Sequence, residues 1–258
     1  MSNPEGTPVW YELITTDLDA AQDFYARVVG WNITRGDFEG MDYRIATTAE
    51  GAPVAGLMKR PDGMPPDPAW FHYLATADVD ATVRAIEKAG GALRMPATDI
   101  PTVGRIAMLA DPQGAGFYVM RGESDEPSRA FLEAGEARPG HAVWNELSSP
   151  DPEASIAFYA ERFGWRQEGA MPMGDLGDYR FIHSGTMRLG AVMGRVPDQR
   201  DGWSFYFMVE DIDAAIRRSD EAGGRVVKGP DEIPGGGFSL IALDPQGGQF
   251  GLVGDRRK

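Results

Sequence analysis

Two glutamates at matching places in the sequence could act as general bases or hold a polar ligand. Glu12 follows Trp10 by two residues, and Glu146 follows Trp144 in the same way. Because alternate side chains of a β-strand share one face, each carboxylate is expected beside its indole. A carboxylate that is partly removed from water holds a proton more readily and can serve as a base. The alternative is that each glutamate pairs with an arginine or lies at a hydrated edge, since an unpaired buried carboxylate is costly.

Arg105 is a candidate for binding an anionic group. It begins the segment Arg-Ile-Ala-Met-Leu, and its counterpart in the second half of the chain is Phe238. An arginine at the mouth of a pocket can hold a carboxylate or a phosphate through two parallel hydrogen bonds. It could equally be a surface arginine or the partner of Glu12. We therefore predict Glu12 and Arg105 as candidate catalytic residues, with the first half suited to a polar ligand and the second half to an apolar one.

Aromatic residues at alternate strand positions are the other candidates for a binding site. Mostly apolar walls with a few polar groups are typical of sites for small molecules. The alternative is that these rings fill the interior, although Gly56, Gly116 and Gly251 are expected to leave room beside them. The predicted ligand-binding residues are Trp10, Phe71, Tyr73, Tyr118, Trp144, Glu146, Ser204 and Tyr206.

The remaining residues that could carry chemistry are few. The sequence contains three histidines and no cysteine, which excludes disulfides, thiol nucleophiles and thiolate metal ligands. We expect His72 to be a structural residue between a sheet and a helix. His141 and His183 are expected in turns or at the surface.

The composition limits the class of partner. A chain of 258 residues is long enough for two domains, and 42% hydrophobic with 25% charged residues is typical of a globular protein. The net charge of −14 opposes binding to nucleic acids and to anionic membranes. No leader with a basic and then an apolar segment is recognised, and no apolar run approaches the roughly 18 residues of a membrane span. We predict a cytoplasmic protein with a small-molecule ligand and neither a nucleic-acid nor a membrane partner.

These residues are placed by a segment that occurs twice. Residues 10–31 recur as residues 144–165, with Trp-x-Glu-Leu at the start, Phe-Tyr in the middle and Gly-Trp at the end, all at an offset of 134. The segment Asp-Pro-Gln-Gly at residues 111–114 recurs at residues 244–247, at an offset of 133. Self-similarity of this extent indicates a tandem duplication.

Within each half the pattern of elements also repeats. An alternating strand at residues 9–16 is followed by Asp17 as helix N-cap and by a helix that ends at Gly30. A second strand and helix begin near residue 70, so each half contains two copies of strand–helix–strand–strand–strand. We predict an α+β fold with a first domain at residues 1–122, a linker at 123–140 and a second domain at 141–258. Because four such copies need no partner subunit, both a monomer and a homodimer remain possible.

Asp-x-x-Ala, Phe-Tyr and Gly-Trp after the first strand, and Asp-Pro-x-Gly before the last, resemble the vicinal oxygen chelate superfamily. This is the group of glyoxalases, bleomycin-resistance proteins and extradiol dioxygenases. The chain looks closest to a two-domain, glyoxalase-like subgroup with Gly-Thr-Pro-x-Trp near the start, here residues 6–10. The resemblance implies that two βαβββ units pair into an open eight-stranded barrel, so that this chain forms two tandem barrels.

The resemblance also implies where metal ligands would stand. In the family they are histidine or glutamate in the first and the last strand of the βαβββ units. The corresponding residues here are Trp10, Phe71, Trp144 and Ser204 in first strands, and Tyr118, Gly251 and about Gly56 and Ala191 in last strands. Because divalent cations bind imidazole, carboxylate or thiolate, we expect the usual metal site to be missing and predict no cofactor.

Three functions remain open at this point. The first is a metal-independent protein that binds a small, aromatic molecule. The second is a cofactor-independent isomerase or lyase in which Glu12 is the base and Arg105 or Tyr118 stabilises developing charge. The third is a divergent glyoxalase-like or dioxygenase-like metalloenzyme. The sequence leaves open whether the protein is an enzyme.

Overall fold

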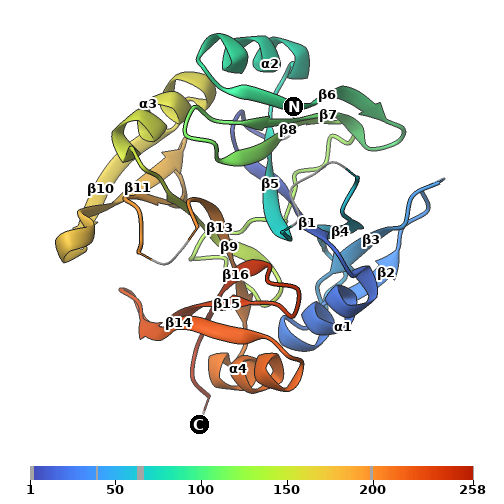
Figure 1. The fold of residues 1–258 in the computed structure, drawn as a ribbon, viewed down its shortest axis with the longest axis vertical. Coiled ribbons are helices and arrows are strands. Elements are labelled where there is room, and N and C mark those ends of the chain that lie inside the picture. The colour runs from blue at the N-terminus through green and yellow to red at the C-terminus, as the bar shows by residue number, and fades with distance from the viewer. Residues whose placement is uncertain (1–2, 39, 63–66, 198–199, 258) are drawn as a thin grey trace. The chain divides into compact units, whose positions relative to one another are not determined.

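Each half of the chain folds as two successive βαβββ units (Figure 1). The computed structural model describes residues 3–38, 40–62, 67–197 and 200–257. The first half contains β1 (Pro8–Thr15), α1 (Leu18–Val28), β2 (Asn32–Arg35), β3 (Tyr43–Thr47), β4 (Pro53–Lys59), β5 (Ala69–Ala75), α2 (Val79–Lys88), β6 (Ala92–Ile100), β7 (Gly104–Ala110) and β8 (Gly116–Gly122). The second half contains β9 (Ala142–Ser148), α3 (Pro152–Phe163), β10 (Arg166–Pro172), β11 (Asp178–Ser184), β12 (Met187–Met193), β13 (Gly202–Val209), α4 (Ile212–Glu221), β14 (Arg225–Glu232), β15 (Phe238–Leu243) and β16 (Gln249–Gly254).

The four α-helices in the described part of the chain begin in the same way. An aspartate precedes each helix, and its carboxylate accepts a hydrogen bond from a backbone N–H of the first turn. This bond satisfies one of the amide groups that the first helical turn leaves without a partner. The N-caps are Asp17, Asp78, Asp151 and Asp211, which confirms Asp17 as predicted.

The strands form one mixed eight-stranded sheet from each half. Their order is β2-β3-β4-β1-β5-β8-β7-β6 in the first and β10-β11-β12-β9-β13-β16-β15-β14 in the second. Neither sheet closes on itself in the part of the chain that the structure describes. The predicted α+β fold of four βαβββ units in two tandem open barrels is therefore confirmed.

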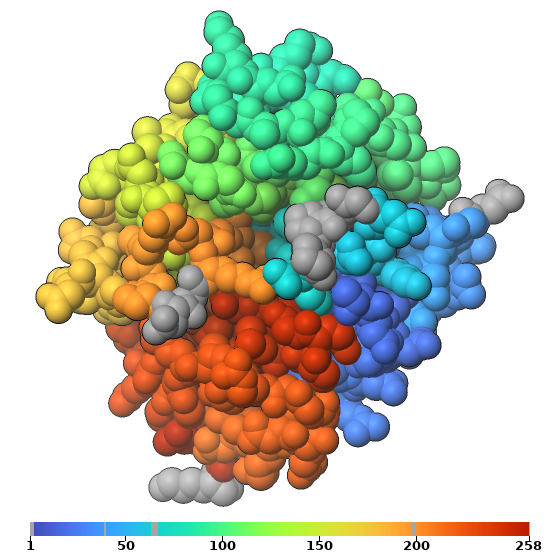
Figure 2. All heavy atoms as spheres, viewed as in Figure 1, coloured from blue at the N-terminus to red at the C-terminus, as the bar shows by residue number. Residues whose placement is uncertain are grey.

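Side-chain packing divides the chain differently from the sheets. One compact unit, which we call unit 1, comprises Met1–Val9, Phe71–Ser128 and Trp144–Trp203. The other, unit 2, comprises Trp10–Trp70, Arg129–Val143 and Ser204–Lys258. Each unit thus takes one βαβββ segment from each half of the sequence. In unit 2, α4 and β14 contact each other and lie side by side at the molecular surface (Figure 2, orange).

The repeated Phe-Tyr and Asp-Pro-Gln-Gly motifs meet inside these units. In unit 1 the Tyr159 hydroxyl donates to Asp111 (3.2 Å) and accepts from Trp203 Nε1 (3.0 Å). Asp111 also accepts the backbone N–H groups of Gln113 and Ala115, which fixes its own loop. These groups bring a helix of one half against a loop of the other half.

Unit 2 repeats the arrangement with the halves exchanged. The Tyr25 hydroxyl donates to Asp244 (3.0 Å) and accepts from Trp70 Nε1 (2.9 Å). Phe24 and Phe250 pack edge to face beside this network, at 5.6 Å between ring centroids. We refer to the two networks as the Tyr–Asp locks.

The segment that connects the halves is partly buried. Ala130, Phe131 and Leu132 are buried, and Phe131 forms an isolated bridge with Ala142. Earlier in the segment, the Ser128 hydroxyl donates to the Val9 carbonyl at 2.6 Å. Most of the other residues between 123 and 140 are exposed, so only part of the predicted linker is packed. None of the described helices is long and apolar enough to cross a membrane.

Candidate ligand-binding site

A tryptophan, a tyrosine and a glutamate form a hydrogen-bonded relay in unit 1. Trp144 and Glu146 stand two residues apart on β9, and Tyr179 lies on β11. Trp144 Nε1 donates to the Tyr179 hydroxyl at 2.6 Å, and this hydroxyl donates to Glu146 Oε2 at 2.6 Å. The indole and phenol rings are stacked, 8° from parallel. The relay fixes the orientation of two partly exposed rings and places a carboxylate beside them.

The same face of unit 1 continues past the relay. Ala191 of β12 pairs with Glu146 on one side and with Phe181 on the other, so these residues share a face with Trp144 and Tyr179. Phe181 meets the Trp144 ring edge to face, with 6.1 Å between their centroids. We call Trp144, Tyr179 and Phe181 the aromatic wall.

Unit 2 contains the counterpart of the relay. Trp10 Nε1 donates to the Tyr43 hydroxyl at 2.9 Å, and Glu12 lies on the same strand with 3% of its surface exposed. Glu12 pairs with Gly56 in the neighbouring strand. A Cβ atom on Gly56 would overlap the Tyr43 hydroxyl and ring. The room expected at this glycine is therefore taken up by Tyr43.

The other two glycines are also covered by rings, which corrects the expectation that they leave space. In unit 1, a Cβ atom on Gly116 would lie 2.9 Å from the Phe71 ring. In unit 2, a Cβ atom on Gly251 would overlap the ring of Tyr206. At these positions the alternative prediction, that rings fill the interior, describes the packing better.

The remaining predicted ligand-binding residues are largely buried. Tyr73 and Tyr118 of unit 1 stack in parallel with 4.3 Å between their ring centroids, and Phe71 meets Tyr118 at 6.0 Å. In unit 2 the Ser204 hydroxyl accepts a hydrogen bond from Gln249 Nε2 at 2.7 Å. The wall in unit 1 and the Trp10–Tyr43 pair in unit 2 therefore keep more exposed ring surface than these residues do.

Arg105 does not lie where the sequence predicts. Its side chain makes two parallel hydrogen bonds to Asp80 of α2, at 2.8 and 2.9 Å, and an ion pair with Asp99. These carboxylates raise the pKa of Arg105, and the hydrogen-bonded guanidinium of Arg105 lowers the pKa of Asp80. In the register of β7 and β8, Arg105 pairs with Arg121 while Met108 pairs with Tyr118, which puts Arg105 on the opposite face from Tyr118. Arg105 is therefore a partly exposed arginine in an ion pair, which agrees with the alternative that it is a surface residue.

The histidines serve packing in different ways. His72 is fully buried in unit 1, 4.6 Å from the Trp203 ring, and burial lowers its pKa to about 3, although the Asn145 side chain acts to raise it. This confirms its predicted structural place. His141 lies in a turn, as expected, with its backbone N–H donating to the Arg138 carbonyl, although its side chain is buried. His183 is buried on β11, which corrects the expectation for that residue. His141 Nδ1 lies 2.6 Å from the Arg129 carbonyl oxygen.

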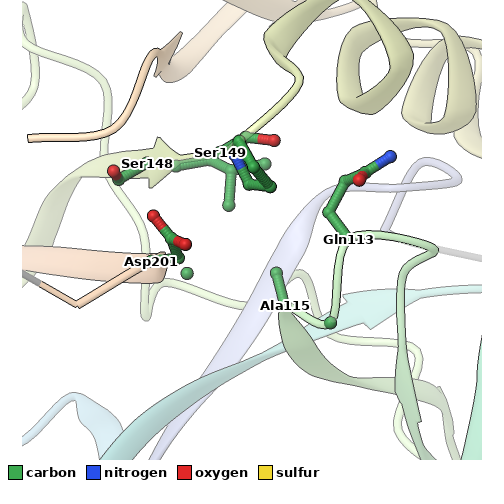
Figure 3. A pocket seen from close by; sticks show the side chains of 9 residues that line it. Gln113, Ala115, Ser148, Ser149 and Asp201 are labelled. Carbon is green, nitrogen blue, oxygen red and sulfur yellow. The ribbon is translucent and has the colours of Figure 1, made fainter.

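Unit 1 also contains a small polar cavity that the sequence did not indicate. Its volume is about 60 Å³, enough for a few water molecules and well below the usual size of a site for an organic ligand. Ser148, Ser149 and Asp201 lie on one side, and Gln113 and Ala115 on the other (Figure 3). The cavity lies where the Asp-Pro-Gln-Gly loop meets the ends of two strands.

Comparison with known proteins supports the resemblance predicted from the repeated motifs. The glyoxalase/bleomycin resistance protein/dioxygenase superfamily matches residues 7–119 and 138–252. The chain belongs to this superfamily. Among full-length relatives, the protein named Putative glyoxylase CFP32 of Mycobacterium tuberculosis is 33% identical over 254 residues, covering 96% of this chain and 95% of the relative. The anthracycline biosynthesis protein DnrV of Streptomyces peucetius is 34% identical over 269 residues, covering 96% and 93%.

Solved structures of the superfamily share the fold at low sequence identity. A variant of homoprotocatechuate 2,3-dioxygenase from B. fuscum gives a TM-score of 0.66 at 18% identity, covering 98% of this chain and 73% of that one. The Mn(II)-bound glyoxalase from Novosphingobium aromaticivorans gives 0.63 at 18% identity, covering 98% and 83%.

The side chains of this superfamily member do not fit the metal that such relatives bind. At the expected ligand positions stand indole, phenyl, phenol and hydroxyl groups, alanine and two glycines, which supply none of the imidazole or carboxylate donors that a divalent cation requires. Around Gly56 and Gly251, tyrosine rings occupy the space of a ligand side chain. Within the described ranges, no group of three or more His, Cys, Asp or Glu side chains is arranged to hold a metal ion.

Proposed function

We propose that the protein is a metal-independent member of the glyoxalase/bleomycin resistance/dioxygenase superfamily that binds a small aromatic molecule in a barrel cavity. The observation that carries the proposal is the Trp144–Tyr179–Glu146 relay. An indole stands at the family's ligand position, and its polar N–H is already satisfied by a phenol. The position thus presents a ring face rather than a metal donor.

The physical basis is preorganised stacking. Aromatic pairs in offset or edge-to-face contact contribute about 0.5–1.5 kcal/mol beyond their area burial. The relay holds Trp144 and Tyr179 in one geometry before a ligand arrives, so that less conformational entropy is lost on binding. Glu146, which already accepts a bond from Tyr179, provides a polar group that can fix the orientation of a ligand hydroxyl.

The name of one relative supports the same class of ligand. One relative at 34% identity is named for anthracycline biosynthesis, and anthracyclines contain fused aromatic rings. In line with the net charge of −14, we propose a small molecule as the partner rather than nucleic acid or membrane, in the cytoplasm, with the protein as a monomer or homodimer.

The test combines metal analysis with calorimetric titration. We expect tag-free protein purified without chelator to contain far less than one Zn, Fe, Mn or Ni per chain. We expect it to bind 2-naphthol, a neutral two-ring probe, equally well with and without EDTA. Trp144→Leu and Tyr179→Phe should each weaken that binding several-fold, whereas Arg94→Gln, at an exposed position of β6, should leave it unchanged. A stoichiometric metal, or binding that requires one, would contradict the proposal in favour of a divergent metalloenzyme.

A second candidate function is a cofactor-independent isomerase or lyase with Glu12 as the base. The burial of Glu12 beside the Trp10–Tyr43 pair favours it, because a base shielded from water is effective in proton transfer. On this alternative, Glu12→Gln abolishes turnover while the thermal unfolding midpoint changes little. Arg105 no longer supports this mechanism, because its side chain is held by Asp80 and Asp99.

A further inference from the structure

A cationic side chain lies at one end of the aromatic wall in unit 1. The guanidinium carbon of Arg188 lies 5.2 Å from the centroid of the Phe181 ring, within the range of a cation–π contact. Arg188 Nε also donates to His183 Nε2 at 3.3 Å. Arg188 is exposed, whereas His183 beneath it is buried. The ring and the imidazole thus fix the orientation of the guanidinium group, and the Arg188 side chain remains at the surface.

The strand register places Arg188 on the face of the wall. His183 follows Phe181 by two residues on β11 and therefore shares its face, and His183 pairs with Arg188 across a bulge in β12. The wall residue Tyr179 precedes Phe181 by two residues on the same strand. One face of unit 1 therefore carries the carboxylate of Glu146, the aromatic wall and the guanidinium of Arg188.

The corresponding face of unit 2 lacks the cation. There Ile45 pairs with Gly56 as Phe181 pairs with Ala191, and Thr47 pairs with Pro53 as His183 pairs with Arg188. The aromatic ring, the imidazole and the arginine are replaced by isoleucine, threonine and proline. The tryptophan–tyrosine hydrogen bond is common to both copies of the duplicated unit, but the arginine beside it occurs in one of them.

We propose that the aromatic wall of unit 1 binds a planar aromatic molecule that carries an anionic group, with its ring against Trp144 and its anionic group at the guanidinium of Arg188. This inference rests on the proposed function and names the chemical class of its ligand. In a protein with a net charge of −14, the long-range field repels anions, so a local cation is needed to hold one. Guanidinium is suited to the task because it is weakly hydrated and can pair with a carboxylate through two hydrogen bonds.

Glu146, which accepts a hydrogen bond from Tyr179 of the wall, determines the direction in which the ligand lies. Its carboxylate repels an anionic group and favours a hydrogen-bond donor, so Glu146 and Arg188 recognise different groups of one molecule. The earlier expectation assigned the polar ligand to the first half through Arg105. The structure assigns the cationic anchor to the second half.

The test compares two ligands of equal shape by calorimetric titration of the full chain. The probes are 2-naphthoate, which is an anion at pH 7.5, and 2-naphthol, which is neutral. We expect Arg188→Gln to weaken 2-naphthoate binding about tenfold and to change 2-naphthol binding less than twofold. Arg188→Lys, which keeps the charge without the planar fork, should give an intermediate loss. Arg94→Gln removes the same charge from an exposed position of β6 and should affect neither ligand.

The outcomes separate this inference from the proposed function. If the wild type binds both probes and Trp144→Leu weakens both, but Arg188→Gln weakens them equally or not at all, the ligand class is wrong and the aromatic site stands. If neither probe binds, or Trp144→Leu has no effect, both proposals fail. Thermal unfolding of each variant shows whether a loss of binding comes from misfolding. If Arg188→Gln does not fold, Arg188→Lys is the variant that tests whether 2-naphthoate binding is weakened selectively.

Discussion

At the scale of single residues, the hydroxyls of Tyr43 and Tyr179 are the groups that hold two tryptophan side chains in place. Each accepts the indole N–H of a tryptophan at a ligand position, and Tyr179 passes the bond on to Glu146. A hydrogen bond to a charged group contributes about 1.5–3 kcal/mol, and one between neutral groups about 1 kcal/mol. The two copies therefore use the same polar pair of indole and phenol at the positions where the family resemblance predicts metal donors.

The close approach of Tyr43 to Gly56 gives a stability prediction. Gly56→Ala should lower the free energy of unfolding by about 1–3 kcal/mol, because its methyl group would overlap the Tyr43 hydroxyl and the ring must move. Gly135→Ala is the matched control, since a Cβ atom there meets nothing within 4 Å. Urea unfolding followed by circular dichroism measures both. Equal stability of the two variants would show that Tyr43 does not occupy this space.

His72 gives a prediction of pH dependence. Its pKa is about 3 in the folded protein and about 6.5 in an unfolded chain, so the unfolded state takes up the proton first as the pH falls. The contribution of His72 to stability is therefore complete above pH 6.5 and is lost between pH 6.5 and 3, at a rate of at most about 1.4 kcal/mol per pH unit.

The variant His72→Phe isolates this effect, because Phe205 already stands at the equivalent place in unit 2. The difference in unfolding free energy between wild type and variant should shift in favour of the variant as the pH is lowered from 7 to 4. Asp111 and Asp244 have pKa values raised by burial and act in the opposite direction, but they are present in both proteins and cancel. Two parallel stability curves would exclude a buried neutral His72.

At the scale of elements, much of the architecture follows from local sequence. Helix starts are encoded by aspartate N-caps, and the Asp-Pro-Gln-Gly loops are encoded by an aspartate that accepts its own loop's amide groups. Both signals act over a few residues, and the N-cap prediction at Asp17 is confirmed. The repeat also predicts the number of βαβββ units, because two copies of similar sequence are expected to fold in the same way.

The site was harder to predict because it depends on strand faces and on distant pairing. Arg105 was placed on the wrong face, since the register of β7 with β8 cannot be read from local sequence. Tyr43 and Tyr179 were missed, although the segment Asp-Tyr-Arg occurs at both places and signals them. Arg44 and Arg180 in these segments bind Asp19 and Glu153 in the first turns of helices, which explains why the segment is repeated.

The Tyr–Asp lock of unit 1 gives a prediction at this scale. Tyr159→Phe removes a donor from buried Asp111 and an acceptor from Trp203, and should lower the unfolding free energy by about 2–3 kcal/mol. Losing the donor further raises the pKa of Asp111, which burial has already raised, so the cost should be larger at pH 8 than at pH 5. Urea unfolding at both pH values measures this. A cost below about 0.5 kcal/mol at pH 8 would mean that the lock is not a stabilising contact.

At the scale of the whole molecule, hydrogen bonding and packing follow different divisions of the chain. Each eight-stranded sheet is built from one half, whereas each compact unit joins one βαβββ segment of each half. The core of unit 2, for example, brings Tyr11 within 5.2 Å of Phe205. A half chain would therefore expose apolar surface from both units.

Fragment experiments test this organisation. We expect residues 1–122 and residues 141–258, produced separately, to show no cooperative unfolding transition, because each has lost the partner of both Tyr–Asp locks. Produced together, they should form a one-to-one complex that unfolds cooperatively. Size-exclusion chromatography with circular dichroism provides the readout. A monomeric fragment 1–122 with a sharp transition would show that the predicted first domain folds on its own.

The crossed locks also bear on the ancestry of the chain. Tyr25 reaches from the first half to Asp244 in the second, and Tyr159 reaches from the second half to Asp111 in the first. An ancestor of half the length would make both locks with a second identical copy, as a two-fold symmetric dimer. When the two copies are joined in one gene, both Tyr–Asp locks are kept. The two copies can then differ in sequence. The arginine at position 188 and the proline at position 53 are then two descendants of one ancestral residue.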